Sequence, residues 1–196
     1  MTTLCLASAS PRRRQLLDQI GVPHVVLATG TDEARAPGES PADYVRRVAA
    51  DKARAALARG AGGACAVLAA DTAVVLGDEI FGKPAGVEDC VAMLGCLGGR
   101  THEVLTAVAI AWDGRIEGEL SVSRVTLRPI DERECREYWA TGEPRDKAGG
   151  YAVQGLAAVF IERIEGSYSG VMGLPLFETA RLLARAGVHH WSGGAG

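Results

Sequence analysis

The chain has 196 residues, of which 47% are hydrophobic and 23% charged, and its formal net charge is −3. This length suits one well-filled core, and the balanced charge offers no bulk attraction for nucleic acid, so we expect no nucleic-acid partner and only local anion binding. No apolar run is long enough to cross a bilayer, and the first ten residues lack the pattern of a signal peptide. These features predict a cytoplasmic protein with no membrane partner.

The first half of the chain alternates apolar runs with helical patterns. Pro11 suits the first turn of a helix because it has no N–H to donate, and Ser40 followed by Asp43 is a good helix start. The elements predicted here are a strand at 4–7, a helix at 11–20, a strand at 24–28, a helix at 41–59 and a strand at 67–76.

The second half contains a strong hairpin pattern. Asp113-Gly114 separates two long apolar runs, as expected for two antiparallel strands joined by a two-residue turn. The predicted elements are strands at 79–81, 101–112, 115–127 and 158–165, and helices at 87–97, 131–141 and 176–186. The sequence therefore predicts an α/β fold with a mixed sheet, because a purely parallel sheet would not contain that hairpin.

The five cysteines are odd in number, scattered and without a C-x-x-C pair. This distribution favours reduced, mostly buried thiols without a catalytic role over a disulfide framework or a zinc site. The four histidines also lack metal-ligand spacing.

Two familiar motifs are matched only superficially. "GDEIFGK" fits the P-loop spacing, but Pro84 follows where a Ser or Thr is required, and Asp78 and Glu79 would repel phosphate. Lys83 remains a candidate for substrate binding. "GSYSG" has Tyr168 at the position that a serine nucleophile would need, so a serine hydrolase is not supported.

A first anion-binding cluster follows the first predicted strand, in "SASPRRR". The hydroxyls of Ser8 and Ser10, the free amides of a helix start and the guanidinium groups of Arg12 and Arg13 would form a compact phosphate site. The alternative is that Ser10 only caps the helix and the arginines are solvated. Arg14 is expected at the surface, because three consecutive arginines cannot all face one ligand.

The acidic candidates lie in "TDEA" and "AADT". Asp71 ends an apolar run, where ligands of open α/β sheets commonly bind, although such a residue also caps turns. Asp32 and Glu33 lie in a loop whose ordinary fate is solvation. If that loop folds over the cleft, a carboxylate from it and Asp71 could share a divalent cation, and oxygen ligands favour Mg²⁺ or Mn²⁺.

A third cluster, residues 142–155, combines four glycines with Asp146, Lys147 and Gln154. Such a loop offers backbone amides, a cation and a side-chain amide, which phosphate binding and base recognition both require. A glycine-rich turn required only by chain geometry remains the alternative. The three clusters together favour a ligand.

The segments "LASASPRR", "ADT", "GKP", "DKAGGYAVQG" and "GSYSGVMGLPL" occur in this order between Leu6 and Leu176. They resemble the Maf family of nucleoside triphosphate pyrophosphatases. The resemblance implies an elongated mixed sheet flanked by helices, with two lobes around a cleft, similar to inosine triphosphate pyrophosphatases, and a homodimer. We expect one bilobed domain at 1–188 and a frayed, weakly patterned tail at 189–196.

The resemblance also implies a reaction, hydrolysis of a nucleoside triphosphate to its monophosphate and pyrophosphate with a divalent cation. It makes Asp71 the proton acceptor and places Glu33 and Asp71 beside the metal. It further implies that Glu33 and Lys83 are catalytic residues alongside Asp71. The residues implied to bind the substrate are Ser8, Ser10, Arg13, Lys52 and Lys147. As an isolated residue, Lys52 would be assigned to the solvated surface.

The subgroup similar to dTTP/UTP pyrophosphatases has arginine, threonine and glutamine at three specificity positions, which here are Arg12, Thr72 and Gln154. The subgroup acting on 7-methyl-GTP tends to have tryptophan, glutamine and glutamate there. The resemblance therefore implies dTTP and UTP, with CTP or modified pyrimidine nucleotides as further candidates. Two alternatives stay open: a nucleotide-sensing binding protein linked to septum formation, and a general phosphatase releasing orthophosphate.

Overall fold

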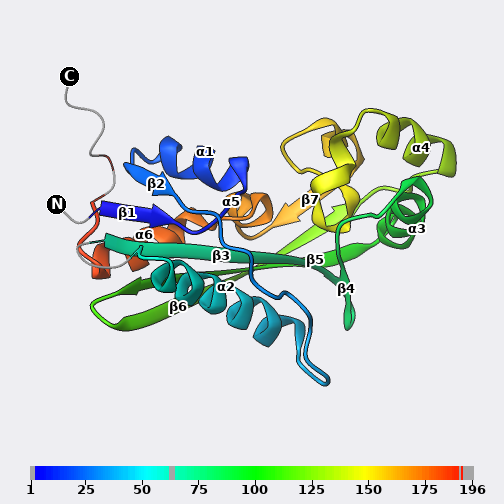
Figure 1. The fold of residues 1–196 in the computed structure, drawn as a ribbon. Coiled ribbons are helices and arrows are strands. Elements are labelled where there is room, and N and C mark those ends of the chain that lie inside the picture. Colours follow the sequence, from blue (N-terminus) through cyan, green and yellow to red (C-terminus); the bar gives the residue numbers. More distant parts are fainter. Residues whose placement is uncertain (1–2, 62–64, 190, 192–196) are drawn as a thin grey trace.

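The computed structural model describes residues 3–61, 65–189 and 191, and they form an open mixed sheet flanked by helices (Figure 1). The strands are β1 (Thr3–Leu6), β2 (His24–Val26), β3 (Cys65–Leu76), β4 (Glu79–Phe81), β5 (Thr101–Trp112), β6 (Arg115–Leu127) and β7 (Ile161–Glu165). The α-helices are α1 (Pro11–Gln19), α2 (Pro41–Ala58), α3 (Val87–Leu97), α4 (Glu132–Ala140), α5 (Tyr168–Met172) and α6 (Leu176–Arg185). The prediction of a mixed α/β sheet is confirmed.

The strand order is β2-β1-β3-β5-β6-β7, and β4 pairs with the far half of β3. The strands β2, β1 and β3 are parallel to one another, whereas the pairs from β3 through β5 and β6 to β7 are antiparallel. The turn between β5 and β6 has positive φ at Asp113 (48°) and Gly114 (72°). Two positive φ values are what a type I′ turn needs, which confirms the predicted hairpin.

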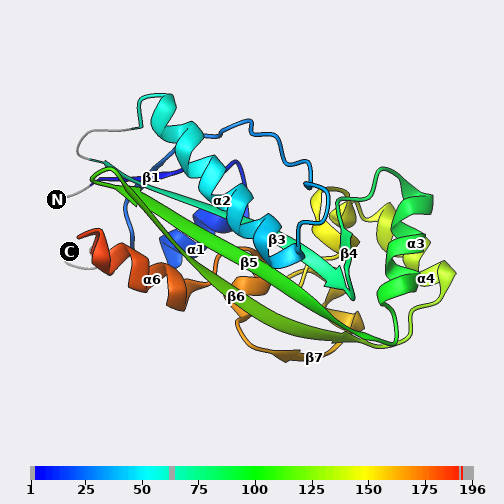
Figure 2. The same ribbon diagram turned by 90° about the horizontal axis from the view of Figure 1, so that it is seen from below.

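Helix α2 covers one face of the sheet, and α1, α5 and α6 lie on the opposite face (Figure 2). The pleat of β3 serves both layers, because successive side chains point to opposite faces. Leu68 and Ala70 pack with residues of α1 and α6, while Val67 and Ala69 pack with residues of α2. This double coverage explains why β3 is a nearly continuous apolar run.

A second apolar core lies at the far end of the sheet, beneath α3 and α4. On the face of β3 that carries Ala70, Thr72 separates the two cores, since Ala70 belongs to the first and Val74 to the second. Thr106 on β5 lies directly opposite Thr72. Two polar side chains thus mark the boundary between the cores, which is where a ligand can reach the sheet.

One edge of β3 is open in its middle. Strand β1 pairs with β3 only as far as Leu68, and β4 pairs with it only from Val74 onward. Within the part of the chain that the structure describes, residues 69–73 therefore have a strand neighbour on the β5 side alone. This gap gives access to side chains on both faces of the same strand.

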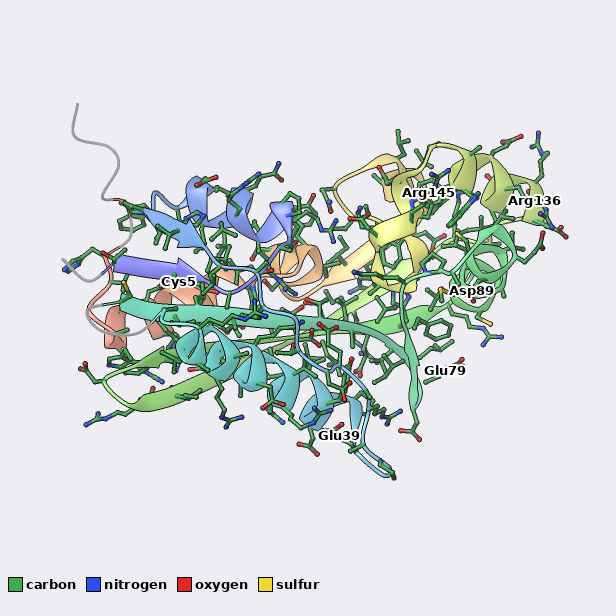
Figure 3. All side chains as sticks on the ribbon, in the orientation of Figure 1. Cys5, Glu39, Glu79, Asp89, Arg136 and Arg145 are labelled. Atoms are coloured by element: carbon green, nitrogen blue, oxygen red, sulfur yellow. The ribbon has the colours of Figure 1, made fainter. Side chains whose placement is uncertain are left out.

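Charged side chains cover the outside of the molecule, among them Glu79 at the tip of β4 and Arg136 on α4 (Figure 3). Three of the five cysteines are buried, Cys65 is half-buried and Cys96 is exposed, and all five are free thiols. No helix among the described residues is both long and apolar enough to span a bilayer.

Three predicted boundaries differ from the structure by two residues or more. The strand expected at 67–76 begins at Cys65. The strand expected at 158–165 begins only at Ile161, because Leu156–Phe160 forms a 3₁₀ helix, and the strand expected at 24–28 ends at Val26. The short helix α5 was not predicted. Of the predicted tail, residues 190 and 192–196 lie outside the described residues, and the single bilobed domain at 1–188 stays a prediction.

Candidate active site

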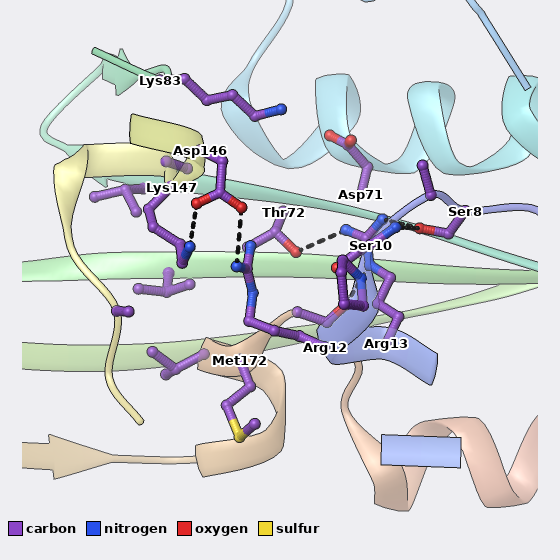
Figure 4. A pocket seen from close by; sticks show the side chains of 18 of the residues that line it. Ser8, Ser10, Arg12, Arg13, Asp71, Thr72, Lys83, Asp146, Lys147 and Met172 are labelled. Atoms are coloured by element: carbon purple, nitrogen blue, oxygen red, sulfur yellow. Dashed lines mark hydrogen bonds and ion pairs between the residues drawn. The ribbon is translucent and has the colours of Figure 1, made fainter. Parts of the chain in front are cut away.

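A cavity of about 350 Å³ lies at the open edge of β3 (Figure 4). Every residue that the sequence analysis assigned to the site lines it: Ser8, Ser10, Arg12, Arg13, Glu33, Lys52, Asp71, Thr72, Lys83, Lys147 and Gln154. These residues come from six separate segments of the chain. Two neighbours do not take part: Asp32 accepts the N–H of Ala34 at 2.9 Å, and Arg14 is exposed.

The loop between β1 and α1 forms one wall. Ser10 occupies the N-cap position of α1, but its side chain makes no capping hydrogen bond. The alternative that Ser10 serves only as a helix cap is therefore wrong for its hydroxyl, which remains available to a ligand. Ser8 is buried, and its Oγ accepts the N–H of Ser10 at 3.2 Å.

Arg13 is held by three hydrogen bonds. Its Nε donates to the carbonyl oxygen of Gly173 at 2.8 Å, and its two terminal nitrogens donate to Ser8 Oγ at 3.1 Å and Thr72 Oγ1 at 3.2 Å. A guanidinium group has five N–H donors, so two remain for an anion in a fixed fork. Burial lowers the pKa of Arg13, and the charge of Asp71 opposes this effect.

Thr72 is fixed from its other side by Thr106. Thr106 Oγ1 lies 3.0 Å from Thr72 Oγ1 and 2.8 Å from the carbonyl oxygen of Gly170. Because Thr106 is fully buried, this link ties the cavity floor to α5. Thr72 therefore presents a defined hydroxyl position to the cavity.

Lys52 joins two carboxylates on the α2 side of the cavity. Its Nζ lies 2.8 Å from Asp71 Oδ1 and 2.8 Å from Glu33 Oε1. The side chains of Lys52 and Asp71 are 11% and 8% exposed, whereas that of Glu33 is 51% exposed. Burial raises the pKa of Asp71, although the charges of Lys52 and Arg13 act in the opposite direction.

The two carboxylates of Glu33 and Asp71 suit a hard divalent cation only when a bound substrate supplies further oxygen ligands. Among the described residues there is no group of three or more His, Cys, Asp or Glu side chains that would hold a metal alone. Glu33 and Asp71 nevertheless converge on a single positive charge, that of Lys52. Mg²⁺ is commonly bound by one or two carboxylates together with water and substrate phosphate oxygens, so these residues fit such an ion.

The glycine-rich segment forms the opposite wall. Asp146 makes ion pairs with Lys147 and, at 3.5 Å, with Arg12 on α1, so it bridges the mouth of the cavity (Figure 4). Lys83 is exposed and makes no hydrogen bond or ion pair within the described ranges. Five basic side chains and three carboxylates line the cavity, which makes it locally positive in a chain of net charge −3.

The sequence analysis missed several contributors. Thr106 interrupts an apolar row on β5, and such an interruption opposite Thr72 is the pattern that could have identified it. Thr29 Oγ1 is buried with no hydrogen-bond partner among the described residues, and the residue lines the cavity. Gly173 belongs to a quoted family segment, but its carbonyl contact with Arg13 requires the folded chain.

Comparison with known proteins gives a consistent result. The dTTP/UTP pyrophosphatase of Cupriavidus metallidurans is 54% identical over 195 residues, covering 95% of this chain and 98% of its own length. Proteins of the same name from Alkalilimnicola ehrlichii and Methylococcus capsulatus are 52% and 54% identical, covering 95% and 94% of this chain and 95% and 91% of their own lengths. The family of Maf-like proteins matches residues 3–186. With this match over almost the whole chain, the protein belongs to the Maf-like family.

Proposed function

We propose that this protein hydrolyses dTTP and UTP to the nucleoside monophosphate and pyrophosphate. The observation that carries the proposal is the cavity itself, in which the buried carboxylate of Asp71 lies beside the anchored guanidinium of Arg13. The substrate class comes from the relatives, which are named dTTP/UTP pyrophosphatases and are about half identical over nearly the whole chain.

Triphosphate binding is assigned to the basic side chains that line the cavity. Arg13 offers two free N–H groups in a rigid fork, and Lys83 offers an ammonium group that has no partner among the described residues. Ser8 and Ser10 contribute hydroxyl groups from the loop before α1, and the backbone amides at the start of this helix also favour anions. Lys52 and Lys147 must exchange carboxylate partners for phosphate oxygens when substrate enters.

Asp71 is the proposed proton acceptor. A water oxygen forms a bond to the α-phosphorus, the bond from that phosphorus to the bridging oxygen of the β-phosphate breaks, and the water proton passes to Asp71. Because burial raises the pKa of this carboxylate, it is a stronger base than an exposed aspartate. Pyrophosphate leaves with the bridging oxygen.

Mg²⁺ or Mn²⁺ is the proposed cofactor, with Glu33 and Asp71 as its protein ligands. When bound, such an ion neutralises charge on the phosphate oxygens. Glu33 is half-exposed in a loop without regular structure, so it can adjust its position to a bound ion.

Base recognition is assigned to Arg12, Thr72 and Gln154. The three residues line the cavity from three separate segments, and the amide of Gln154 both donates and accepts hydrogen bonds, as the edge of uracil or thymine requires. Arg12 is free to contact the base once it leaves Asp146.

The decisive experiment is a nucleotide panel with Mg²⁺ or Mn²⁺, measuring pyrophosphate and orthophosphate separately. We expect dTTP and UTP to give equal amounts of monophosphate and pyrophosphate. Orthophosphate as the first product would identify a phosphatase, and tight nucleotide binding without any product would identify a nucleotide-sensing binding protein. Both outcomes contradict the proposal.

The proposed assembly is a homodimer in the cytoplasm. Leu156, Val159 and Phe177 are 57%, 69% and 70% exposed, which leaves apolar surface for a second copy. Light scattering across a concentration series measures the mass, and a monomer at all concentrations would contradict the dimer.

A further inference from the structure

Gln154 is carried by a short turn. The N–H of Gly155 donates to the carbonyl oxygen of Ala152 at 3.1 Å, which closes the turn, and the Gln154 side chain is exposed and lines the cavity. No hydrogen bond holds its amide within the described residues. The backbone of the turn therefore sets the point from which this side chain starts, and with it the part of the cavity that the Gln154 amide can reach.

Glu143 binds the backbone on one side of the turn. Its Oε2 accepts the N–H of Leu156 at 2.9 Å, and its Oε1 accepts the N–H of Ala157 at 3.2 Å. These are the first two residues of the 3₁₀ helix that follows the turn. One carboxylate thus satisfies two N–H groups that have no partner within that helix.

Tyr138 binds the backbone on the other side. This residue of α4 is buried, and its hydroxyl donates to Glu143 Oε1 at 2.6 Å while accepting the N–H of Ala152 at 3.3 Å. Its ring packs edge-on against Phe160, with 5.4 Å between the ring centroids. Tyr138 and Glu143 together hold the chain at both ends of the turn.

The turn is shaped to admit this carboxylate. A Cβ at Gly155 would lie 2.1 Å from Glu143 Oε2, so only glycine allows the close approach. A separate contact supports the residue before the turn, because the Tyr151 hydroxyl lies 2.7 Å from Nε2 of His102 on β5, and both side chains are buried. The surrounding structure thus determines the backbone of the turn at several points.

We propose that Tyr138 and Glu143 are positioning residues that determine base specificity by fixing the turn that carries Gln154. Neither residue lines the cavity, so they act through Gln154 and not by touching the nucleotide. The inference rests on the proposed function. When the turn is fixed, only the side-chain torsions of Gln154 are ordered on pairing with the base, whereas a mobile turn must be ordered as well, which weakens the recognition of uracil.

Tyr138→Phe tests this inference, because it keeps the ring and removes the hydroxyl. The measured quantity is the ratio of kcat/KM for UTP to kcat/KM for GTP, which reports base choice and is insensitive to the fraction of folded enzyme. We expect the ratio to fall by about tenfold, the scale of one net hydrogen bond. In a Gln154→Ala background the same substitution should leave the ratio unchanged, since coupled residues are not additive.

Two control variants separate positioning from general destabilisation. Val22→Ala weakens the first core, which contains neither Tyr138 nor a residue of the turn, and Tyr168→Phe removes a hydroxyl from an exposed tyrosine. Both should keep the wild-type ratio. If Tyr138→Phe does not fold, Glu143→Gln takes its place in the test. The amide has the same size as the carboxylate but only one oxygen, so one of the two backbone N–H groups of Leu156 and Ala157 loses its acceptor.

A ratio that stays at the wild-type value in folded Tyr138→Phe and Glu143→Gln overturns the inference. An equal fall of the ratio with and without Gln154 also overturns it, because the effect would not pass through that residue. A wild-type enzyme that releases no pyrophosphate from UTP overturns the proposed function instead, so the two failures are distinguishable.

Discussion

The hydrogen bonds of Arg13 predict a large effect for a substitution that conserves charge. In Arg13→Lys a single nitrogen replaces three separate guanidinium nitrogens, so we expect it to keep one of the three contacts, which go to Ser8, Thr72 and the carbonyl oxygen of Gly173. The substitution also removes the planar fork with two free N–H groups. Both the position of the positive charge and its geometry towards a phosphate change.

The size of the effect follows from these contacts. A hydrogen bond from a charged donor contributes about 1.5–3 kcal/mol, and water replaces part of the two lost bonds because the site is only partly buried. The net loss of transition-state stabilisation is then about 3 kcal/mol, or roughly a hundredfold in kcat/KM for UTP. Burial lowers the pKa of Arg13 already in the wild type, and a lysine loses its charge in such a site more readily than an arginine.

Arg14→Lys is the matched control. Arg14 is adjacent and exposed, and its side chain makes no hydrogen bond or ion pair in the described part of the chain. Steady-state kinetics with UTP give kcat/KM for both variants, and urea unfolding shows that both are folded. If Arg13→Lys stays within about threefold of Arg14→Lys, the assignment of Arg13 as an anchored phosphate ligand is refuted.

Further predictions concern the chemistry and the fold. Asp71→Asn should lower turnover by at least about a hundredfold while UTP still binds in an equilibrium assay, and near-normal turnover would remove Asp71 as proton acceptor. Burial lowers the pKa of His102 to about 4, below its value in the unfolded chain. Between the two pKa values the unfolded chain binds more protons than the folded protein, so the stability of the fold falls as the pH drops from the unfolded pKa to the folded one. Between pH 7 and pH 4.5 the free energy of unfolding, measured with urea, should fall less in His102→Gln than in the wild type, by up to about 3 kcal/mol. An equal fall in both proteins would contradict this prediction. Gly149→Ala should lower the free energy of unfolding more than Gly142→Ala does. Both glycines have positive φ (68° and 81°), but only at Gly149 would a Cβ lie 2.9 Å from a methyl carbon of Val74. Equal urea midpoints for the two variants would contradict this prediction.

The sequence predicted the order and type of most long elements because their apolar periods are strong. Helix α2 and the β5–β6 hairpin have their expected positions to within a residue, since Ser40 caps the first and Asp113-Gly114 forms the turn of the second. The failure at 158–160 has a specific cause. Glu143, fifteen residues earlier than Ala158, binds the N–H groups that start the 3₁₀ helix, and no local pattern shows that contact.

Lys52 shows what a closer use of periodicity would have found. The buried residues of α2 are Val45, Val48, Ala49, Lys52, Ala53 and Ala56, which recur at helical spacing. Lys52 therefore occupies a position on the apolar face, and a lysine there implies a buried acidic partner. The sequence contained this pattern, whereas the identity of the partner, Asp71, required the fold.

Other parts of the site depend on contacts between distant segments. The ion pair of Arg12 with Asp146 and the hydrogen bond of Arg13 to Gly173 join residues more than 130 positions apart. Short motifs indicated that each of these segments contacts a ligand, but only the order of the strands in the sheet shows that the segments meet at one cavity. The roles of the individual side chains stay predictions that the experiments above test.

The open edge of β3 has a consequence for how this enzyme class can diversify. Asp71 and Thr72 are adjacent in the chain, yet the pleat directs one side chain towards α2 and the other towards α1 and α5. The proposed proton acceptor and the proposed base-recognition residue therefore have separate packing environments, although one peptide bond joins them. Substitutions of Thr72 leave the packing around Asp71 on the other face unchanged, but they remove one hydrogen bond of Arg13, so a change of the recognised base requires another partner for this guanidinium.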